Sequence, residues 1–204
     1  MSDEVVVAMI QAVLPVAVII AVIVIVWWLR EPLGSALAGM RHLKVAGVEL
    51  ELAGQALVDD RADQLKSPRL AEDLVERAVG LRDRLADFRI LWVDDHPSNN
   101  QVERRFLRRA GATVINALST REALGELLRD DVDVIVTDFE RVGDRLAGID
   151  FAMSAREAGC RQPILAYIGN ADPSRPAPPH ISLVTDHPDE LLSRVLDIAR
   201  DRPW

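Results

Sequence analysis

Short apolar runs that alternate with helical patterns from Phe88 onward constrain the fold of this chain most strongly. Runs that are apolar along their whole length are typical of parallel strands covered on both faces. Strands that alternate with helices along the chain connect into a doubly wound sheet. Residues 88–204 are therefore predicted to form an α/β domain with a five-stranded parallel, doubly wound sheet. The expected strands are residues 90–93, 113–117, 132–138, 163–168 and 181–184, and the expected helices are residues 98–110, 119–129, 148–158 and 188–200.

Carboxylates follow two of the expected strands. Asp94 and Asp95 close the first strand, and Asp138 closes the third. Doubly wound sheets bind ligands at the carboxyl ends of their strands, so these acids are expected in one pocket if the two strands are neighbours. At ~4 Å and an effective dielectric constant of ~20, two carboxylates repel by about 4 kcal/mol. A cation or a proton must therefore lie among them, and Mg²⁺ is the hard divalent ion that such oxygen ligands favour.

The stretches "ILWVDD" and "VIVTD", in this β/α order, resemble the receiver domain of bacterial two-component response regulators, which has a flavodoxin-like fold. The resemblance covers about residues 88–200. It implies that Asp94 and Asp95 bind Mg²⁺, together with Asp138 and the backbone carbonyl of Glu140. It also implies that Asp138 is the phosphoacceptor, which attacks a phosphoryl group supplied by a histidine kinase.

Two residues of the receiver pattern are missing from this sequence. Receivers carry a Ser or Thr at the end of the fourth strand, where this chain has Ile168. They also carry a Lys after the fifth strand, where this chain reads "TDH" at residues 185–187. The second absence does not depend on the alignment, because no lysine follows Lys66. Losing one donor or cation that faces a developing oxyanion costs about 3–4 kcal/mol.

The segment between the fourth and fifth strands also departs from the receiver pattern. Receivers have a helix there, but residues 169–180 read "GNADPSRPAPPH", with four prolines that forbid a regular helix. The loop after Asp138 looks longer than in receivers and lacks their usual Met-Pro. A switch that moves the hydroxyl residue and this helix would have neither moving part here.

Residues 5–29 are a run of 25 residues without a charge, and residues 1–30 are predicted to hold a single transmembrane helix. Such a helix reaches roughly 37 Å, against about 30 Å of hydrocarbon. A cleavable signal peptide is the alternative, but the apolar run is long for one and the preceding "MSDE" is acidic. Cations follow the run closely, which predicts an N-terminus outside the cell membrane and a cytoplasmic C-terminal domain.

Residues 31–87 are predicted to be a juxtamembrane linker. The stretch "LKVAGVELEL", residues 43–52, suggests a short strand or hairpin because apolar and polar side chains alternate. A helix is expected over about residues 68–87, with Ser67 as its cap and Pro68 in its first turn. Its apolar seam suits packing on the chain's own domain or, as the alternative, a parallel homodimer through residues 71–88. The seam consists of Ala71, Leu74, Ala78, Leu81, Leu85 and Phe88.

The remaining features narrow the class of partner. A net charge of −8 disfavours nucleic acid. Cys160 stands alone, which excludes an internal disulfide and fits a reducing compartment. The basic stretch "ERRFLRR", residues 103–109, suggests a docking patch for an acidic partner or, more simply, a solvated helix face. His96 could relay protons or bind a metal, although a loop histidine without a role is the simpler interpretation.

These observations predict a membrane-tethered, receiver-like signalling or interaction module. It is not expected to be an enzyme, and its partner is a histidine kinase or another signalling protein. Either Asp138 is an authentic phosphoacceptor with Mg²⁺, or the acidic pocket is a relic in a constitutive scaffold, which the missing phosphoryl contacts favour. A Mg²⁺-dependent phosphohydrolase with Asp138 or Asp94 as nucleophile is the third interpretation. It would need a second acid or a cation for the leaving group.

Overall fold

The computed structural model describes residues 47–129, 131–141 and 143–203, all within one compact unit, Ala46–Trp204. The predicted transmembrane segment, residues 5–29, lies outside the described residues. No helix in the described part of the chain is long and apolar enough to cross a membrane.

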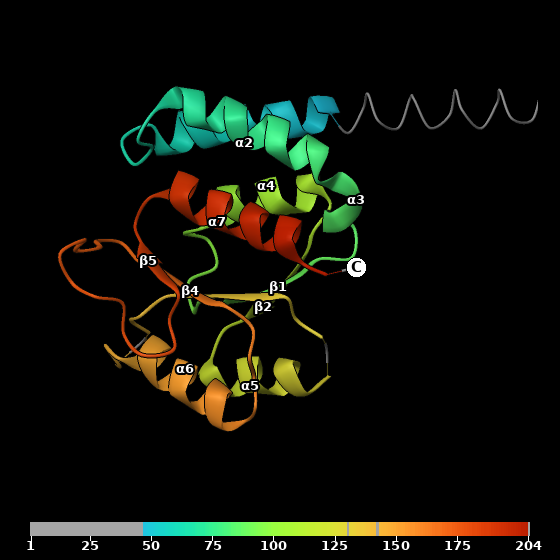
Figure 1. The fold of residues 1–204 in the computed structure, drawn as a ribbon. Coiled ribbons are helices and arrows are strands. Elements are labelled where there is room, and N and C mark those ends of the chain that lie inside the picture. Colours follow the sequence, from blue (N-terminus) through green and yellow to red (C-terminus); the bar gives the residue numbers. More distant parts are fainter. Residues whose placement is uncertain (1–46, 130, 142, 204) are drawn as a thin grey trace, which may run out of the picture. The chain divides into compact units, whose positions relative to one another are not determined.

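A five-stranded parallel sheet forms the centre of this unit, in the order β2-β1-β3-β4-β5 (Figure 1). Its strands are β1 Arg89–Val93, β2 Thr113–Ala117, β3 Val134–Thr137, β4 Ile164–Tyr167 and β5 Leu183–Thr185. The order confirms the doubly wound, flavodoxin-like fold, whose switch point lies between β1 and β3. Val93 is aligned with both Ala117 and Thr137. Asp94 and Asp138 therefore leave adjacent strands at the same edge of the sheet.

Helices cover both faces of the sheet, as the sequence predicts. On one face lie α4 Gln101–Ala110 and α7 Pro188–Asp201, and on the other lie α5 Thr120–Arg129 and α6 Ala147–Glu157 (Figure 1). Side chains alternate along β1, so Trp92 joins one core, with side chains of α4 and α7, while Leu91 and Val93 join the other. Two apolar cores thus hold the sheet between its helical layers.

Turn chemistry sets the ends of these helices. α4 begins at Gln101 rather than at the expected Ser98, because residues 97–100 form a turn. Gly111 ends it with a left-handed φ of 118°, which suits glycine. At the start of α5, the Glu122 N–H donates to Ser119 Oγ at 3.2 Å, as the expected helix cap requires.

A further layer of helices covers α4 and α7 on the side away from the sheet (Figure 1). It consists of the helix of residues 47–61, α2 Pro68–Gly80 and α3 Arg82–Leu85. The predicted strand or hairpin is wrong for its described residues, 47–52, which are helical. Leu50, Ala53 and Leu57 are buried at helical spacing, and this packing outweighs the local alternation of polar and apolar side chains.

Apolar packing makes this layer part of the domain rather than a linker. Leu74, Ala78 and Leu85 of the predicted seam lie in one core cluster with Trp92. This confirms packing on the chain's own domain, and it leaves the seam buried rather than free for a homodimer. The α2 helix ends at Gly80, short of the expected residue 87. The boundary expected at residues 87 and 88 falls inside the compact unit.

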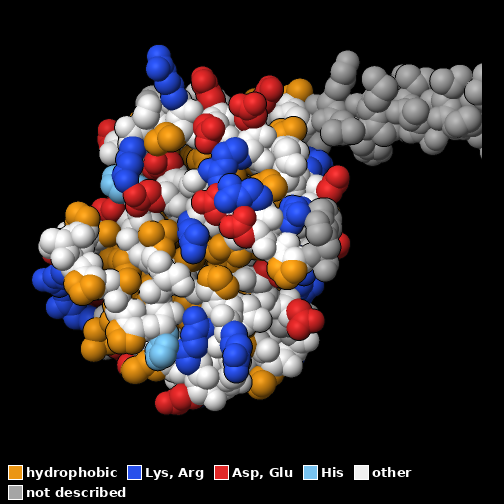
Figure 2. Space-filling model, viewed as in Figure 1, with side chains coloured by type: hydrophobic (Ala, Val, Ile, Leu, Met, Phe, Trp, Pro, Cys, Tyr) orange, Lys and Arg blue, Asp and Glu red, His pale blue; other side chains and the backbone are white. Residues whose placement is uncertain are grey.

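Polar contacts also link this layer to α7. Arg77 of α2 donates to Asp197 at 2.8 Å and to Ser193 Oγ at 2.6 Å. Lys66, in the turn before α2, pairs with Glu190. Figure 2 shows acidic and basic side chains interspersed over this face of the molecule. The two helical layers are therefore joined by a mixed apolar and ionic interface.

Candidate functional site

Asp94 leaves the carboxyl end of β1 and holds the turn that follows. Its backbone N–H donates to the Ala117 carbonyl at 3.0 Å. One carboxylate oxygen accepts from the His96 backbone N–H at 2.7 Å, and the other accepts from Asn100 Nδ2 at 2.6 Å. Asp94 is only 5% exposed, and these bonds compensate the loss of water around its charge.

Asp95 and His96 form the outer part of the acidic edge. His96 Nδ1 lies 2.9 Å from Asp95 Oδ1, and this hydrogen bond raises the pKa of His96 above its ordinary value. Among the described residues, Asp94, Asp95 and His96 form the group whose candidate metal-ligand atoms all lie within 4.8 Å of one another. His96 is thus an exposed loop residue that is hydrogen-bonded to the acid beside it.

Asp138 leaves the carboxyl end of β3 and is paired with an arginine that the sequence did not single out. Arg141, only 7% exposed, donates from Nε to Asp138 Oδ1 at 3.0 Å. Its Nη1 donates to the Thr120 hydroxyl at 2.8 Å, and its Nη2 donates to the Thr137 hydroxyl at 2.6 Å. The guanidinium also lies 5.8 Å from the centroid of the Phe151 ring. The chain therefore supplies a fixed cation to the predicted phosphoacceptor.

Burial dominates the electrostatics of Asp138. It raises the pKa of this carboxyl to about 6. Arg141 opposes the rise, whereas the nearby charges of Asp94 and Asp95 add to it. The guanidinium thus offsets only part of the lost solvation, and Asp138 titrates close to neutral pH.

The loop after Asp138 passes very close to the start of α6. A Cβ on Gly148 would lie 1.9 Å from the Asp138 carbonyl oxygen, so this approach requires glycine. The Gly148 N–H donates to the Phe139 carbonyl at 3.1 Å. Glu140, whose backbone carbonyl is the other predicted metal ligand, lies in this loop with an exposed side chain.

The ends of β4 and β5 carry neither of the expected receiver groups. Ile168 is partly buried against the core that includes α5 and α6. Thr185 donates its hydroxyl to Glu190 at 2.6 Å, and Lys66, the single lysine among the described residues, pairs with the same carboxylate. Residues 169–180 contain no helix, as their prolines predict. The cation beside Asp138 comes instead from Arg141.

The oxygen donors at this edge fit a Mg²⁺ ion. Asp94 and Asp95 bring carboxylate oxygens together, and hard divalent ions favour such ligands. Both oxygens of Asp94 already accept hydrogen bonds, and one oxygen of Asp138 accepts from Arg141. Asp94 and Asp95 would therefore hold the ion, and Asp138 would join them only in competition with Arg141.

A buried carboxylate on the opposite face of the sheet was not predicted. Glu103 of α4 is fully buried and accepts from Tyr167 Oη at 3.0 Å and from Arg61 Nε at 2.8 Å. Burial raises the pKa of the Tyr167 hydroxyl, and the Glu103 charge adds to this effect. Tyr167 points away from Asp138, as strand alternation predicts, so it does not replace the hydroxyl missing at Ile168.

Comparisons with known proteins found similarity only among solved structures. No protein-family model and no curated protein matches the chain. The response regulator TrrA from Thermotoga maritima, in complex with Mg²⁺-BeF, is 22% identical with a TM-score of 0.48, covering 55% of this chain and 99% of that one. CheY4 of Vibrio cholerae is 24% identical with a TM-score of 0.45, covering 54% of this chain and 98% of that one. The receiver domain of Francisella response regulator 1452 is 21% identical with a TM-score of 0.47, covering 56% of this chain and 98% of that one.

Proposed function

We propose that this chain is a membrane-tethered, receiver-like interaction module whose acidic pocket is closed by its own arginine. It acts by binding a protein partner rather than by turnover. The observation that carries the proposal is the contact between Asp138 and Arg141, 3.0 Å apart, in which the arginine is buried and the carboxylate is half-buried. A phosphoryl donor that approaches Asp138 meets a carboxylate that is already paired.

The surroundings of Arg141 hold it in place. Its hydrogen bonds to Thr120, the first residue of α5, and to Thr137, the last residue of β3, hold it at two elements, so it cannot leave Asp138 without losing several contacts. Breaking a buried ion pair costs about 3–5 kcal/mol when one partner is left behind. A pocket closed in this way favours one conformation and therefore a constitutive scaffold over a switch.

The missing receiver groups support the same proposal. A phosphoryl group on Asp138 would find no hydroxyl at Ile168, and the nearest lysine in the described chain is bound to Glu190. The segment between β4 and β5 has no helix that could report the change. Added charge on Asp138 would thus have few routes to a distant surface.

A slow phosphoacceptor is the second candidate, and Arg141 is also the observation that favours it. A guanidinium fork can bind phosphoryl oxygens as well as a carboxylate. Mg²⁺ on Asp94 and Asp95 would supply the second positive charge that phosphoryl transfer requires. In this case a histidine kinase would be the partner, and phosphorylation would transfer Arg141 from the carboxylate to the new phosphoryl group.

Fluoroberyllate separates the two candidates, because it mimics a phosphoryl group on an aspartate. Full-length protein in a neutral detergent is mixed with Mg²⁺ and fluoroberyllate, and the bound species is observed by ¹⁹F NMR. The scaffold predicts no bound signal for the wild type. A bound signal that Asp138→Asn abolishes would reject the scaffold and establish the phosphoacceptor.

Membrane attachment is proposed through residues 5–29, with the domain in the cytoplasm. The support is the 25-residue run without charge, followed by Arg30, Arg41 and Lys44. A reporter fused after Trp204 is expected to be active in the cytoplasm. Protease cleavage of that reporter from outside intact cells would contradict the proposed topology.

A further inference from the structure

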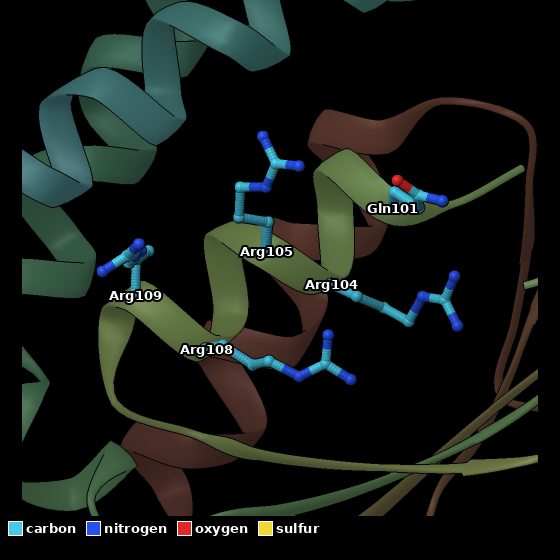
Figure 3. Close-up of a pocket in the computed structure, with 5 residues that line it drawn as sticks. All are labelled: Gln101, Arg104, Arg105, Arg108 and Arg109. Carbon is cyan, nitrogen blue, oxygen red and sulfur yellow. The ribbon is translucent and has the colours of Figure 1, made fainter. Parts of the chain in front are cut away.

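An arginine-lined groove runs along α4, outside the acidic site. It encloses about 430 Å³ and is lined by Gln101, Arg104, Arg105, Arg108 and Arg109. Figure 3 shows the four arginine side chains extending from successive turns of the helix. We call this feature the arginine groove. Its volume lies within the usual range for pockets that bind small molecules.

Arg104 forms a fixed cation in this groove. It is only 4% exposed, and its guanidinium lies 5.7 Å from the centroid of the Trp92 ring. Its Nε donates to the Asn100 carbonyl at 3.1 Å, and its Nη1 donates to Asn116 Oδ1 at 2.9 Å. Because neighbouring groups hold this side chain, a ligand would not have to order it on binding.

The other arginines add a local excess of positive charge. Arg105, Arg108 and Arg109 are exposed; Arg108 donates to the Val114 carbonyl at 3.3 Å, and Arg109 pairs with Glu49 at 2.7 Å. Glu103, the acid on the same helix, faces Arg61 in the core instead of the groove. Arg104 and Arg108, like Arg105 and Arg109, are four residues apart on the helix, where like charges repel. An anion in the groove would relieve this repulsion, in a chain whose net charge is −8.

The geometry favours phosphate over other anions. Guanidinium groups bind phosphate through paired hydrogen bonds, and a planar fork discriminates better than a single ammonium charge. Arg104 and Arg108 extend to one side of α4 and Arg105 and Arg109 to the other (Figure 3), and each pair is separated by about 6 Å along the helix, which is more than one phosphate spans. We propose that the arginine groove binds a small phosphorylated molecule through two or more linked phosphates. The inference is independent of the chemistry at Asp138.

Pyrophosphate is the probe that tests this site. Isothermal titration calorimetry is performed with full-length protein in a neutral detergent, at constant ionic strength. The groove variant is Arg105→Gln with Arg108→Gln, because both side chains are exposed and their loss leaves the core intact. The control variant is Arg121→Gln with Arg161→Gln, which removes the same charge from exposed positions outside the groove.

Saturable binding with one site per chain is expected for the wild type. The groove variant is expected to weaken it by about tenfold or more, since a hydrogen bond between charged groups contributes at least that factor. The control variant is expected to bind like the wild type. No saturable binding, or an equal loss in both variants, would overturn the proposal and indicate only general attraction between charges.

A lipid headgroup offers the same phosphate chemistry, and a second titration separates the two sources. Phosphatidylglycerol is added to the micelles, with phosphatidylcholine as the neutral comparison. Unchanged affinity for pyrophosphate supports a soluble ligand. If phosphatidylglycerol but not phosphatidylcholine lowers the affinity of the wild type for pyrophosphate, the lipid headgroup competes for the site. If the weaker binding of the groove variant is not lowered in the same way, this competition takes place in the groove, which supports the phosphate site and assigns it to a headgroup.

Discussion

Arg141 is the residue whose loss tests the ion pair at the acidic edge. Arg141→Ala leaves Asp138 half-buried without its cation, and because the carboxyl then takes up a proton near pH 7, we expect the free energy of unfolding at pH 7 to fall by about 1–2 kcal/mol. Chemical denaturation measures this loss. Arg145→Ala removes an exposed arginine of the same loop and is expected to change stability by less than about 0.5 kcal/mol. Similar small effects of both substitutions would show that the ion pair contributes little.

Asp138 is expected to weaken the fold at neutral pH. Its pKa is raised from 3.8 to about 6 in the folded protein, so the folded chain holds this proton to a higher pH than the unfolded chain does. The protonated carboxyl stabilises the folded state, and this stability is fully present at pH values below 3.8, the pKa of Asp138 in the unfolded chain. It is lost as the pH rises through about 6, the pKa in the folded chain. About two pKa units would correspond to about 3 kcal/mol, and because solvent screens this half-buried carboxyl, we expect an effect of about 1–2 kcal/mol.

Asp138→Asn removes this titration. In EDTA at pH 7, we expect the variant to unfold at a higher temperature than the wild type, and the difference should disappear near pH 4. Circular dichroism during heating measures both values. Asp131→Asn, at an exposed position, serves as the control for a general change in net charge. A difference that is the same at both pH values would contradict the assignment to Asp138.

Only part of this site could be predicted from the sequence. Asp94, Asp95 and Asp138 were found because apolar strands define their own ends, and side chains at those ends meet at one edge of a parallel sheet. Arg141 depends on how the next loop folds: its backbone and that of Asp144 exchange hydrogen bonds of 2.9 and 2.7 Å, which turns the loop back. The signal in the sequence is an arginine three residues after the acid, whereas the receiver pattern predicts its cation after β5.

The helix α6 meets β3 through a contact that tolerates no side chain. Gly148→Ala would place its Cβ 1.9 Å from the Asp138 carbonyl oxygen, so we expect a loss of about 3 kcal/mol in stability as the loop or helix shifts. Gly125→Ala is the matched control, because a Cβ at this position of α5 meets nothing within 4 Å. It should stabilise the protein by about 0.5–1 kcal/mol. Equal effects in denaturation would contradict the close approach.

The elements of the sheet and the outer helices differ in how well the sequence predicts them. Continuous apolar runs identified β1, β3 and β4, whereas β2 contains two polar residues and β5 begins two residues later than expected. Gly111 and Gly159 marked helix ends. The helix of residues 47–61 was missed because its first residues, "GVELEL", alternate apolar and polar side chains. Gly54 also weakens that pattern, yet its position against Val75 is what lets this helix approach α2: a Cβ there would lie 2.5 Å from Val75 Cγ2.

At the scale of the whole domain, Glu103 connects the outer helical layer to the sheet. Arg61→Met would leave this fully buried carboxylate without its cation, and we expect about 3 kcal/mol of destabilisation. Adding Glu103→Gln removes the unpaired charge and should restore about half of that loss. A double-mutant cycle in chemical denaturation gives the coupling energy. Strictly additive effects would show that Arg61 and Glu103 stabilise the domain independently.

The helices before residue 88 are expected to belong to the cooperative folding unit. A fragment of residues 88–204 retains the sheet but loses Leu50, Leu57 and Leu74, which share a core with α4 and α7. Fully burying each such leucine stabilises by about 1.5–3 kcal/mol, so their combined loss approaches the stability of an ordinary domain. We expect residues 46–204 to unfold in one cooperative transition.

Residues 88–204 alone should bind a hydrophobic dye and unfold without a sharp transition, because the outer surfaces of α4 and α7 are then exposed to water. Thermal unfolding by circular dichroism and dye fluorescence compare the two fragments. A cooperative transition of residues 88–204 at the same temperature would show that the outer helices lie on the domain without stabilising it. The expected result would instead make the outer helices part of the fold, because their buried side chains complete the core that α4 and α7 form on this face of the sheet.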